Sequence, residues 1–198
     1  VVASVSMARL VERAGASAVI AEGGESGGHI GELTTICLVP QVCDAVKIPV
    51  IAAGGIADGR GMAAVLMLGA EGVQIGTRFL VAYECGVHPN YKKKVLKAND
   101  IATMTTGKRL GHPVRSLKNQ YTKAYFKAEY SDISDEELEA FGSGSLYKSA
   151  VEGDEKNGCF LSGQIAGMVN KEESAADIIQ DIMSGTEKVL NGAGKWVK

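Results

Sequence analysis

Residues 48–79, IPVIAAGGIADGRGMAAVLMLGAEGVQIGTRF, decide the fold because two short apolar runs flank one helical pattern. We predict strands over residues 50–53 and 72–75, each followed by glycine. Between them, Asp58 is a favourable N-cap for a helix over residues 59–68. The stretch is therefore predicted to be a β–α–β unit.

The same alternation occupies the preceding part of the chain. Strands are predicted over residues 1–5 and 18–21, with a helix over about 7–14 between them. A further helix is expected to be capped by Thr34 or the next residue. Pro40 is expected in its first turn, where a missing N–H is tolerated.

Four β–α units in series indicate an α/β fold with a parallel sheet, buried on both faces and covered by helices. A spacing of roughly 25 residues suits a TIM (β/α)8 barrel, and an open doubly wound sheet is the alternative. Such a barrel needs about 250 residues, so four units form only half of it. We expect the other half to come from residues that this chain lacks, since the sequence also opens on an apolar run without an initiator methionine.

The alternation ends after Arg78. We therefore divide the chain into barrel units over residues 1–98, an appended substrate-side or lid region over 99–170, and a terminal helix over 171–198 that packs back on the barrel. Residues 88–100 are predicted to contain a short basic helix. Its lysine run is interpreted as a solvated face, with an anion site as the alternative.

Several local signals describe the second half of the chain. Ser134 and Glu137 form a capping box that opens a short acidic helix. Residues 142–159 are expected to be loop-rich, and Asn170 is expected to cap the terminal helix. An apolar stripe on that helix is predicted to pack in the core. It consists of Ile178, Ile179, Ile182 and Met183.

Composition and charge exclude several classes of protein. With 45% hydrophobic and 22% charged residues and a formal net charge of −2, no bulk attraction to nucleic acid or to an anionic membrane is expected. No stretch reaches the roughly 20 apolar residues of a membrane span, and no signal peptide is visible. The four cysteines have neither metal-site nor disulfide-framework spacing, which indicates reduced, buried or half-buried thiols in a cytoplasmic protein, with a metal or redox role as the alternative.

Glycine clusters follow three successive predicted strands. They are EGGESGGHIG at residues 22–31, the pair Gly54 and Gly55, and Gly76 followed by Thr77. Because the carboxyl ends of parallel strands form the functional face of such folds, the three clusters are expected to converge. Exposed backbone N–H groups and the threonine hydroxyl would suit a phosphate, and tight turns without a ligand are the alternative.

His29 lies inside the first glycine cluster. A histidine with an ordinary pKa of about 6.5 can transfer a proton at neutral pH, so His29 is the candidate catalytic residue, with a structural role as the alternative. His88 and His112 each precede a proline and are interpreted as structural.

Three stretches carry a family resemblance: AVIAEGGESGGHIGELTT at residues 18–35, the stretch at 48–79, and HPNYKKKVLKA at 88–98. Together they resemble the flavin-dependent enoyl-acyl-carrier-protein reductases of bacteria, of the FabK type, which are related to nitronate monooxygenases. GHPVRSLKN at 111–119 and GDEKNGCFLSGQIAGMVNKEES at 153–174 extend the resemblance over essentially the whole chain. It covers the second half of the family's barrel, from about the fifth strand.

The resemblance implies an FMN cofactor. Its phosphate would contact Gly54, Gly55, Gly76 and Thr77, and Gln74 would lie beside them. AAGGI alone is shared with other phosphate-binding barrels, whereas EGGESGGHIG together with QIGTRF is specific.

By the same resemblance, Glu22, Gly27 and Gly28 would approach the flavin, and His29 would face the substrate side of the ring. Monooxygenase relatives tend to carry glutamine in place of Glu22, which favours the reductase. The SGQIAG motif is shared by both branches and does not discriminate between them.

The implied reaction is the reduction of a trans-2-enoyl thioester on acyl carrier protein by NADH or NADPH, through FMN, in fatty-acid elongation. A homodimer is expected. His29 would donate a proton to the α-carbon or a hydrogen bond to the thioester carbonyl. The alternatives are a nitronate monooxygenase, in which this histidine acts as a base, and a non-catalytic subunit that binds a phosphate ligand.

Overall fold

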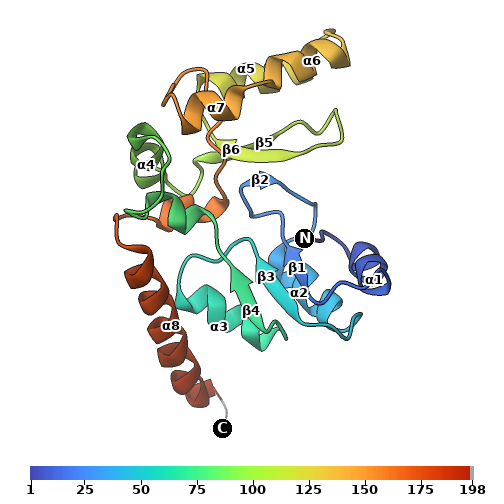
Figure 1. Ribbon diagram of the computed structural model, residues 1–198, viewed down its shortest axis with the longest axis vertical. Helices are drawn as coiled ribbons and strands as arrows, with labels where there is room; N and C mark the ends of the chain where they lie inside the picture. The colour runs from blue at the N-terminus through green and yellow to red at the C-terminus, as the bar shows by residue number, and fades with distance from the viewer. Residues whose placement is uncertain (197–198) are drawn as a thin grey trace. The chain divides into compact units, whose positions relative to one another are not determined.

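The computed structural model describes residues 1–196 and consists of two compact units, whose elements are labelled in Figure 1. The first unit contains Val1–Ser26, Gly31–Ile75 and the C-terminal segment from Glu173. The second unit contains Gly27–Ile30 and Gly76–Glu172. No helix in the described part of the chain combines the length and the apolar character that crossing a membrane requires.

The first unit is built on a parallel sheet. Strands β1 (Val19–Glu22), β3 (Val50–Ala53) and β4 (Gly72–Gln74) lie side by side in the order β1-β3-β4. These three predicted strands are confirmed to within one residue at each end.

The strand predicted over residues 1–5 is wrong except at Val2, which forms a parallel bridge to β1. Ser4 instead caps helix α1 (Val5–Arg13), because its hydroxyl oxygen accepts the N–H of Met7 at 3.3 Å. The helix therefore begins two residues earlier than predicted, and it includes Val5, the last residue of the expected strand.

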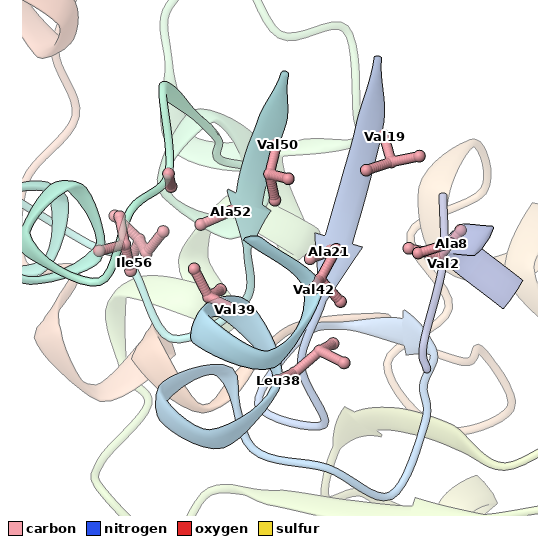
Figure 2. Close-up of a cluster of buried hydrophobic side chains, with 12 residues drawn as sticks. Val2, Ala8, Val19, Ala21, Leu38, Val39, Val42, Val50, Ala52 and Ile56 are labelled. Atoms are coloured by element: carbon pink, nitrogen blue, oxygen red, sulfur yellow. The ribbon is translucent and has the colours of Figure 1, made fainter. Parts of the chain in front are cut away.

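One face of the parallel sheet carries the core of the first unit (Figure 2). Helices α1, α2 (Thr35–Cys43) and α3 (Gly59–Met67) all contribute to this single core. Its buried members are Val2, Ala8, Val19, Ala21, Leu38, Val39, Val42, Val50, Ala52, Ile56, Val65 and Ala70. Successive helices on one face of a parallel sheet are typical of part of a (β/α)8 barrel, whereas a doubly wound sheet has helices on both faces.

The opposite face of the sheet is less deeply buried than the sequence predicts. Ile20 and Ile51 alternate with the core residues of β1 and β3, so their side chains point away from the core formed with α1, α2 and α3. Both are half-buried. The expectation of full burial on both faces therefore holds only for the core-facing residues of β1 and β3. On the other face Ala53 is buried, and β4 has no buried residue.

Helix α2 departs from the prediction in one respect. Thr34 is the N-cap residue, as expected, but Pro40 lies in the second turn of the helix rather than in the first. Because proline has no N–H, α2 lacks one internal hydrogen bond there. The buried side chains of Leu38, Val39 and Val42 hold the helix against the sheet.

Helix α8 (Ala175–Gly192) packs against α3 within the first unit. Asn170 is not its N-cap. Ser174 takes that role, because its hydroxyl oxygen accepts the N–H of Asp177 at 3.0 Å. The helix is followed by the short 3-10 helix η3 (Ala193–Trp196).

The apolar stripe predicted on α8 is divided between core and surface. Ile178 and Ile182 are buried, whereas Ile179 and Met183 are 54% and 51% exposed. The prediction of core packing is therefore correct for Ile178 and Ile182 and wrong for Ile179 and Met183.

The second unit contains an antiparallel sheet with the order β2-β6-β5. Strand β2 (Gly28–His29) belongs to the glycine-rich loop, and it pairs with β6 (Val114–Leu117), which pairs with β5 (Thr103–Thr106). The sequence of β5, TMTT, has no alternating apolar pattern, so the sequence does not predict this sheet.

Several helices complete the second unit. They are η1 (Thr77–Val81), α4 (Pro89–Leu96), α5 (Gln120–Glu129), α6 (Asp135–Gly142), α7 (Ser145–Ala150) and η2 (Gln164–Met168). The capping box predicted at Ser134 and Glu137 is confirmed at the start of α6. Helix α7 lies inside the stretch 142–159 that is expected to be loop, so that expectation is wrong there. The predicted basic helix is confirmed as α4, and His88 caps it by accepting the N–H of Asn90 at Nδ1.

The contact between α3 and α8 depends on two glycines. A Cβ atom added at Gly59 would collide with the backbone of Gly185 and Thr186. A Cβ atom at Gly185 would lie 3.4 Å from the Cα of Gly59. The two helices therefore approach each other through backbone atoms at this point.

We predict that Gly59→Ala destabilises the protein by about 1–3 kcal/mol, the usual range for overpacking a close contact. Gly192→Ala is the matched control, because a Cβ at Gly192 meets no described atom within 4 Å. That control should leave the free energy of unfolding unchanged or raise it slightly. Urea denaturation followed by circular dichroism measures both, and equal effects of the two substitutions would contradict the packing argument.

Candidate functional site

The carboxyl ends of the three parallel strands lie in register. Glu22 at the end of β1 pairs with Ala53 of β3, and Ala53 pairs with Gln74 of β4. The side chain of Gln74 is exposed at this edge. Two of the predicted cofactor-binding residues, Glu22 and Gln74, are therefore brought to one edge of the sheet.

The first part of the glycine-rich loop is fixed to this edge by backbone hydrogen bonds. The N–H of Gly23 donates to the carbonyl oxygen of Ala53 at 3.0 Å, and the N–H of Gly24 donates to that of Leu33 at 2.8 Å. The loop therefore does not extend freely from β1 but returns across the end of β3.

Glu25 is the residue that joins this loop to helix α2. Both oxygens of its carboxylate accept the N–H of Thr35, at 3.0 and 2.9 Å, and Oε2 also lies 2.9 Å from the Thr35 hydroxyl. Thr34, the N-cap residue, makes no capping hydrogen bond with its own side chain. Glu25 thus supplies the acceptor that the first turn of α2 needs, and its negative charge suits the helix N-terminus.

Sequence analysis misses the role of Glu25. Capping residues are recognised next to the helix they cap, whereas Glu25 lies ten positions before Thr35. The buried hydroxyl of Thr35 also lies 3.0 Å from the carbonyl oxygen of Gly54. One threonine therefore connects the glycine-rich loop, the start of α2 and the turn after β3.

Most of the glycines near this edge have a structural reason of their own. Gly54 and Gly55 have φ angles of +91° and +70°, which L side chains rarely adopt. A Cβ at Gly23 would collide with Thr35, and one at Gly31 would lie 2.6 Å from the Cβ of Ala3. The glycine content of this region therefore does not by itself point to a ligand.

Gly27 and Gly28, the two glycines of this loop that belong to the second unit, also have structural reasons of their own. Gly27 packs on the backbone of Ser162 and Gly163, where an added Cβ would lie about 2.6 Å from the nearest backbone atoms. Gly28 has a φ angle of +85° at the start of β2. Contact of either residue with a flavin stays a prediction.

His29 is exposed, and its position is set by the pairing of β2 with Val114 of β6. The ring of His112, also exposed, lies with its centroid 6.5 Å from that of His29, at an interplanar angle of 80°. The structure therefore places a second imidazole beside the candidate catalytic one. The sequence carries no signal for this proximity, because the two histidines are brought together only by the antiparallel sheet.

The loop that carries His112 is held by a buried carboxylate. Glu129 of α5 is 3% exposed, and it accepts the N–H of Gly107 at 3.0 Å and that of Arg109 at 2.9 Å. Arg109 in turn forms an ion pair with Asp135 at 2.8 Å. A buried carboxylate with two backbone donors is a strong local restraint, so the loop is fixed from the side of α5.

Gly76 differs from the other glycines of the predicted cofactor site. Its φ angle is −103°, and a Cβ built on it meets no described atom within 4 Å. Neither backbone geometry nor packing within residues 1–196 requires glycine there. Glycine at position 76 leaves room for the close approach of a ligand, which is the role predicted for it.

Thr77 follows Gly76 at the start of η1 and is buried. Its hydroxyl oxygen accepts the N–H of Gly163 at 2.8 Å, which leaves its own proton available to donate. Gly54 and Gly55 belong to the first unit and Gly76 and Thr77 to the second. Their joint contact with one phosphate therefore stays a prediction.

Two of the four cysteines, Cys43 and Cys159, have raised pKa values and are therefore poor nucleophiles at neutral pH. None of the four forms a disulfide within the described residues. Burial raises the pKa of the Cys159 thiol to about 11. Burial also raises the pKa of Cys43. Both are protonated at neutral pH. Cys37, by contrast, is exposed.

Comparison with known proteins assigns the chain to a family. The profile of the family described as nitronate monooxygenase matches residues 1–185. The chain belongs to the nitronate monooxygenase family. Members of this family are flavin-dependent oxidoreductases.

Curated relatives in the nitronate monooxygenase family include two named probable nitronate monooxygenase. The protein from Staphylococcus saprophyticus is 37% identical over 95% of this chain and 56% of its own length. That from Bacillus subtilis is 41% identical over 60% of this chain and 37% of its own length. The chain thus spans about half the length of the curated relatives it matches.

Similar solved structures give the fold a direct counterpart. FabK from Thermotoga maritima is 49% identical, with a TM-score of 0.96, and the match covers 99% of this chain and 62% of that one. A nitroalkane oxidase from Streptomyces ansochromogenes is 32% identical, with a TM-score of 0.82, over 96% of this chain and 57% of that one. The chain therefore has the α/β fold of part of a TIM-barrel-like protein.

We predict that Glu25→Ala lowers the free energy of unfolding by about 1–3 kcal/mol, because it removes the acceptor of the Thr35 N–H at the start of α2. The amide of Thr35 should also exchange faster with deuterium. Glu32→Ala, at an exposed position of the same loop, is the control. Unchanged exchange at Thr35 in the Glu25→Ala variant would show that Glu25 does not cap α2.

Proposed function

We propose that this chain is the FMN-binding and substrate-binding part of an oxidoreductase that reduces trans-2-enoyl thioesters of acyl carrier protein with NADH or NADPH. The observation that carries the proposal is the 49% identity to FabK over 99% of the chain. The two probable nitronate monooxygenases are 37% and 41% identical, over 95% and 60% of the chain. Two features of the sequence support the same choice. Its motifs resemble those of enoyl reductases, and position 22 is glutamate and not glutamine.

The residues present fit FMN at one position in particular. Gly76 leaves open space beside the first N–H groups of η1, where a phosphate could approach the backbone. The Thr77 hydroxyl retains a proton to donate. When bound, the flavin supplies the hydride transfer between nicotinamide and substrate.

The chain's own residues would hold the substrate and deliver the proton. His29 is exposed on β2, with its backbone fixed by β6, so its ring can reach a ligand without rearrangement of the loop. It would donate a proton to the α-carbon of the thioester or a hydrogen bond to the carbonyl oxygen. His112 beside it would contribute a second polar contact to the same substrate.

A nitronate monooxygenase is the second candidate, supported by the names of the curated relatives and by the nitroalkane oxidase structure. In that reaction His29 would remove a proton from the nitroalkane instead of donating one. Consumption of NADH or NADPH that depends on an enoyl thioester identifies the reductase, and oxygen consumption that depends on a nitronate identifies the monooxygenase. Absence of flavin absorption from a protein that contains the whole barrel would contradict both.

We predict that Gly76→Val empties the flavin site while the protein remains folded, because the side chain enters space that the protein itself does not use. Gly86→Val is the matched control, since a Cβ at Gly86 likewise meets no described atom within 4 Å. Absorption near the flavin bands, relative to protein concentration, measures occupancy, and circular dichroism checks the fold. Full occupancy in Gly76→Val would remove this residue from the phosphate site.

We predict that His29→Ala slows flavin reoxidation by an enoyl thioester by about 10²–10⁴-fold, the usual contribution of general acid catalysis. Flavin reduction by NADH or NADPH needs no proton from His29 and serves as the internal control. Stopped-flow measurement of both half-reactions in one preparation separates the two. If reoxidation keeps its wild-type rate with FMN fully bound, His29 has a structural role.

A further inference from the structure

A polar hollow of about 270 Å³ in the second unit is lined by side chains from three separate segments. Helix α4 and the residue after it contribute Lys93, Lys94 and Lys97. Lys118, directly after β6, faces them, and Glu155 is the single acidic residue in the lining. Four cations around one hollow give it a strongly positive potential, since clefts concentrate the field of the charges that line them.

Within the described residues, none of these four lysines forms an ion pair with a carboxylate, because none has a carboxylate oxygen within 4.0 Å of its nitrogen. Lys118 donates to the carbonyl oxygen of Ile101 at 2.6 Å, and Lys93 and Lys97 make no side-chain hydrogen bond in the described structure. The hollow therefore retains donors for an external anion.

Lys94 is placed differently from a lysine on a solvated face. Its nitrogen lies 5.1 Å from the centre of the buried ring of Phe160, and its side chain is half-buried. Burial lowers the pKa of its ammonium group, against the opposing attraction of Glu155. A cation partly withdrawn from water gains more from an anionic ligand than a fully solvated one does.

We propose that this hollow binds the phosphate group of the pantetheine arm that carries the thioester substrate. The inference rests on the proposed function, in which the substrate is a thioester of acyl carrier protein. Lysines bind phosphate as point charges, and four of the nine residues that line this hollow are lysines.

The placement of the hollow relative to His29 supports this ligand. Both belong to the second unit, and β6 connects them. His29 pairs with Val114 at one end of the strand, and Lys118 follows Leu117 at the other. Four residue steps at about 3.3 Å separate Val114 from Lys118 by roughly 13 Å along the strand. A thioester beside His29 and a phosphate beside Lys118 would be spaced as the two ends of one long, flexible arm.

The experiment compares ligands that differ only in the phosphate. Isothermal titration measures binding of 4′-phosphopantetheine and of pantetheine at low ionic strength. The test variant is Lys93→Glu/Lys97→Glu, and the matched control is Lys123→Glu/Lys127→Glu. The control pair has the same spacing and exposure on α5 of the same unit. We expect the wild-type protein and the control to bind the phosphorylated ligand at least tenfold more tightly, and the test variant to lose that preference.

Steady-state kinetics gives the second readout. The test variant should raise KM for crotonyl-acyl-carrier-protein at least tenfold and leave kcat unchanged. KM for the phosphate-free N-acetylcysteamine thioester should also stay unchanged. Equal binding of the two pantetheine ligands by the wild-type protein would overturn the inference. So would a rise in KM for NADPH without one for the carrier-linked substrate, because the hollow would then serve the nucleotide.

Failure of the proposed function is distinguishable from failure of this inference. If the wild-type protein reduces neither thioester, the proposed function is wrong, whatever the titrations give. If it reduces both, and the charge reversal changes neither KM nor phosphopantetheine binding, the function stands and the inference is wrong.

Discussion

Burial of one face of the parallel sheet is the constraint on which the rest of the first unit depends. Small and β-branched residues of β1 and β3 meet Leu38, Val39 and Val42 of α2, and this contact fixes the strands in register. The register then places the ends of β1, β3 and β4 at one edge. The packing of the core therefore determines where the loops at this edge begin.

Two carboxylates fix the loops that follow or join the strands and helices of the two units. Glu25 accepts the first N–H of α2 in the first unit, and Glu129 accepts two N–H groups of the β5–β6 loop in the second. Each satisfies backbone donors that the regular hydrogen bonds of a helix or strand leave unpaired. Both therefore act on the geometry of a loop.

The sequence predicts the elements whose signals are local. The β3–α3–β4 unit follows from its apolar runs and the Asp58 cap, and the Ser134 capping box lies where its spacing indicates. It fails where a competing local interaction decides, as when Ser4 caps α1 within the predicted first strand, or Ser174 replaces Asn170 at α8. Sequence-based prediction also fails where two interacting residues are far apart in the sequence. Glu25 and Thr35 are one such pair, and His29 and His112 are another. Among the predicted site glycines, only the structure separates Gly76 from those that packing or backbone geometry already requires.

Strand β2 has a consequence for how this protein can be altered by recombination. Its two residues lie between segments of the first unit, yet their hydrogen-bonding partner β6 begins at Val114. A contiguous exchange of residues 76–172 for those of a relative would leave the glycine-rich loop unchanged in sequence. The exchange would nevertheless replace β6, the strand that pairs with His29. It would also replace His112, whose ring lies beside that of His29. Substrate preference could therefore diverge between homologues whose histidine loops are identical, through changes confined to a segment that contains none of the parallel strands.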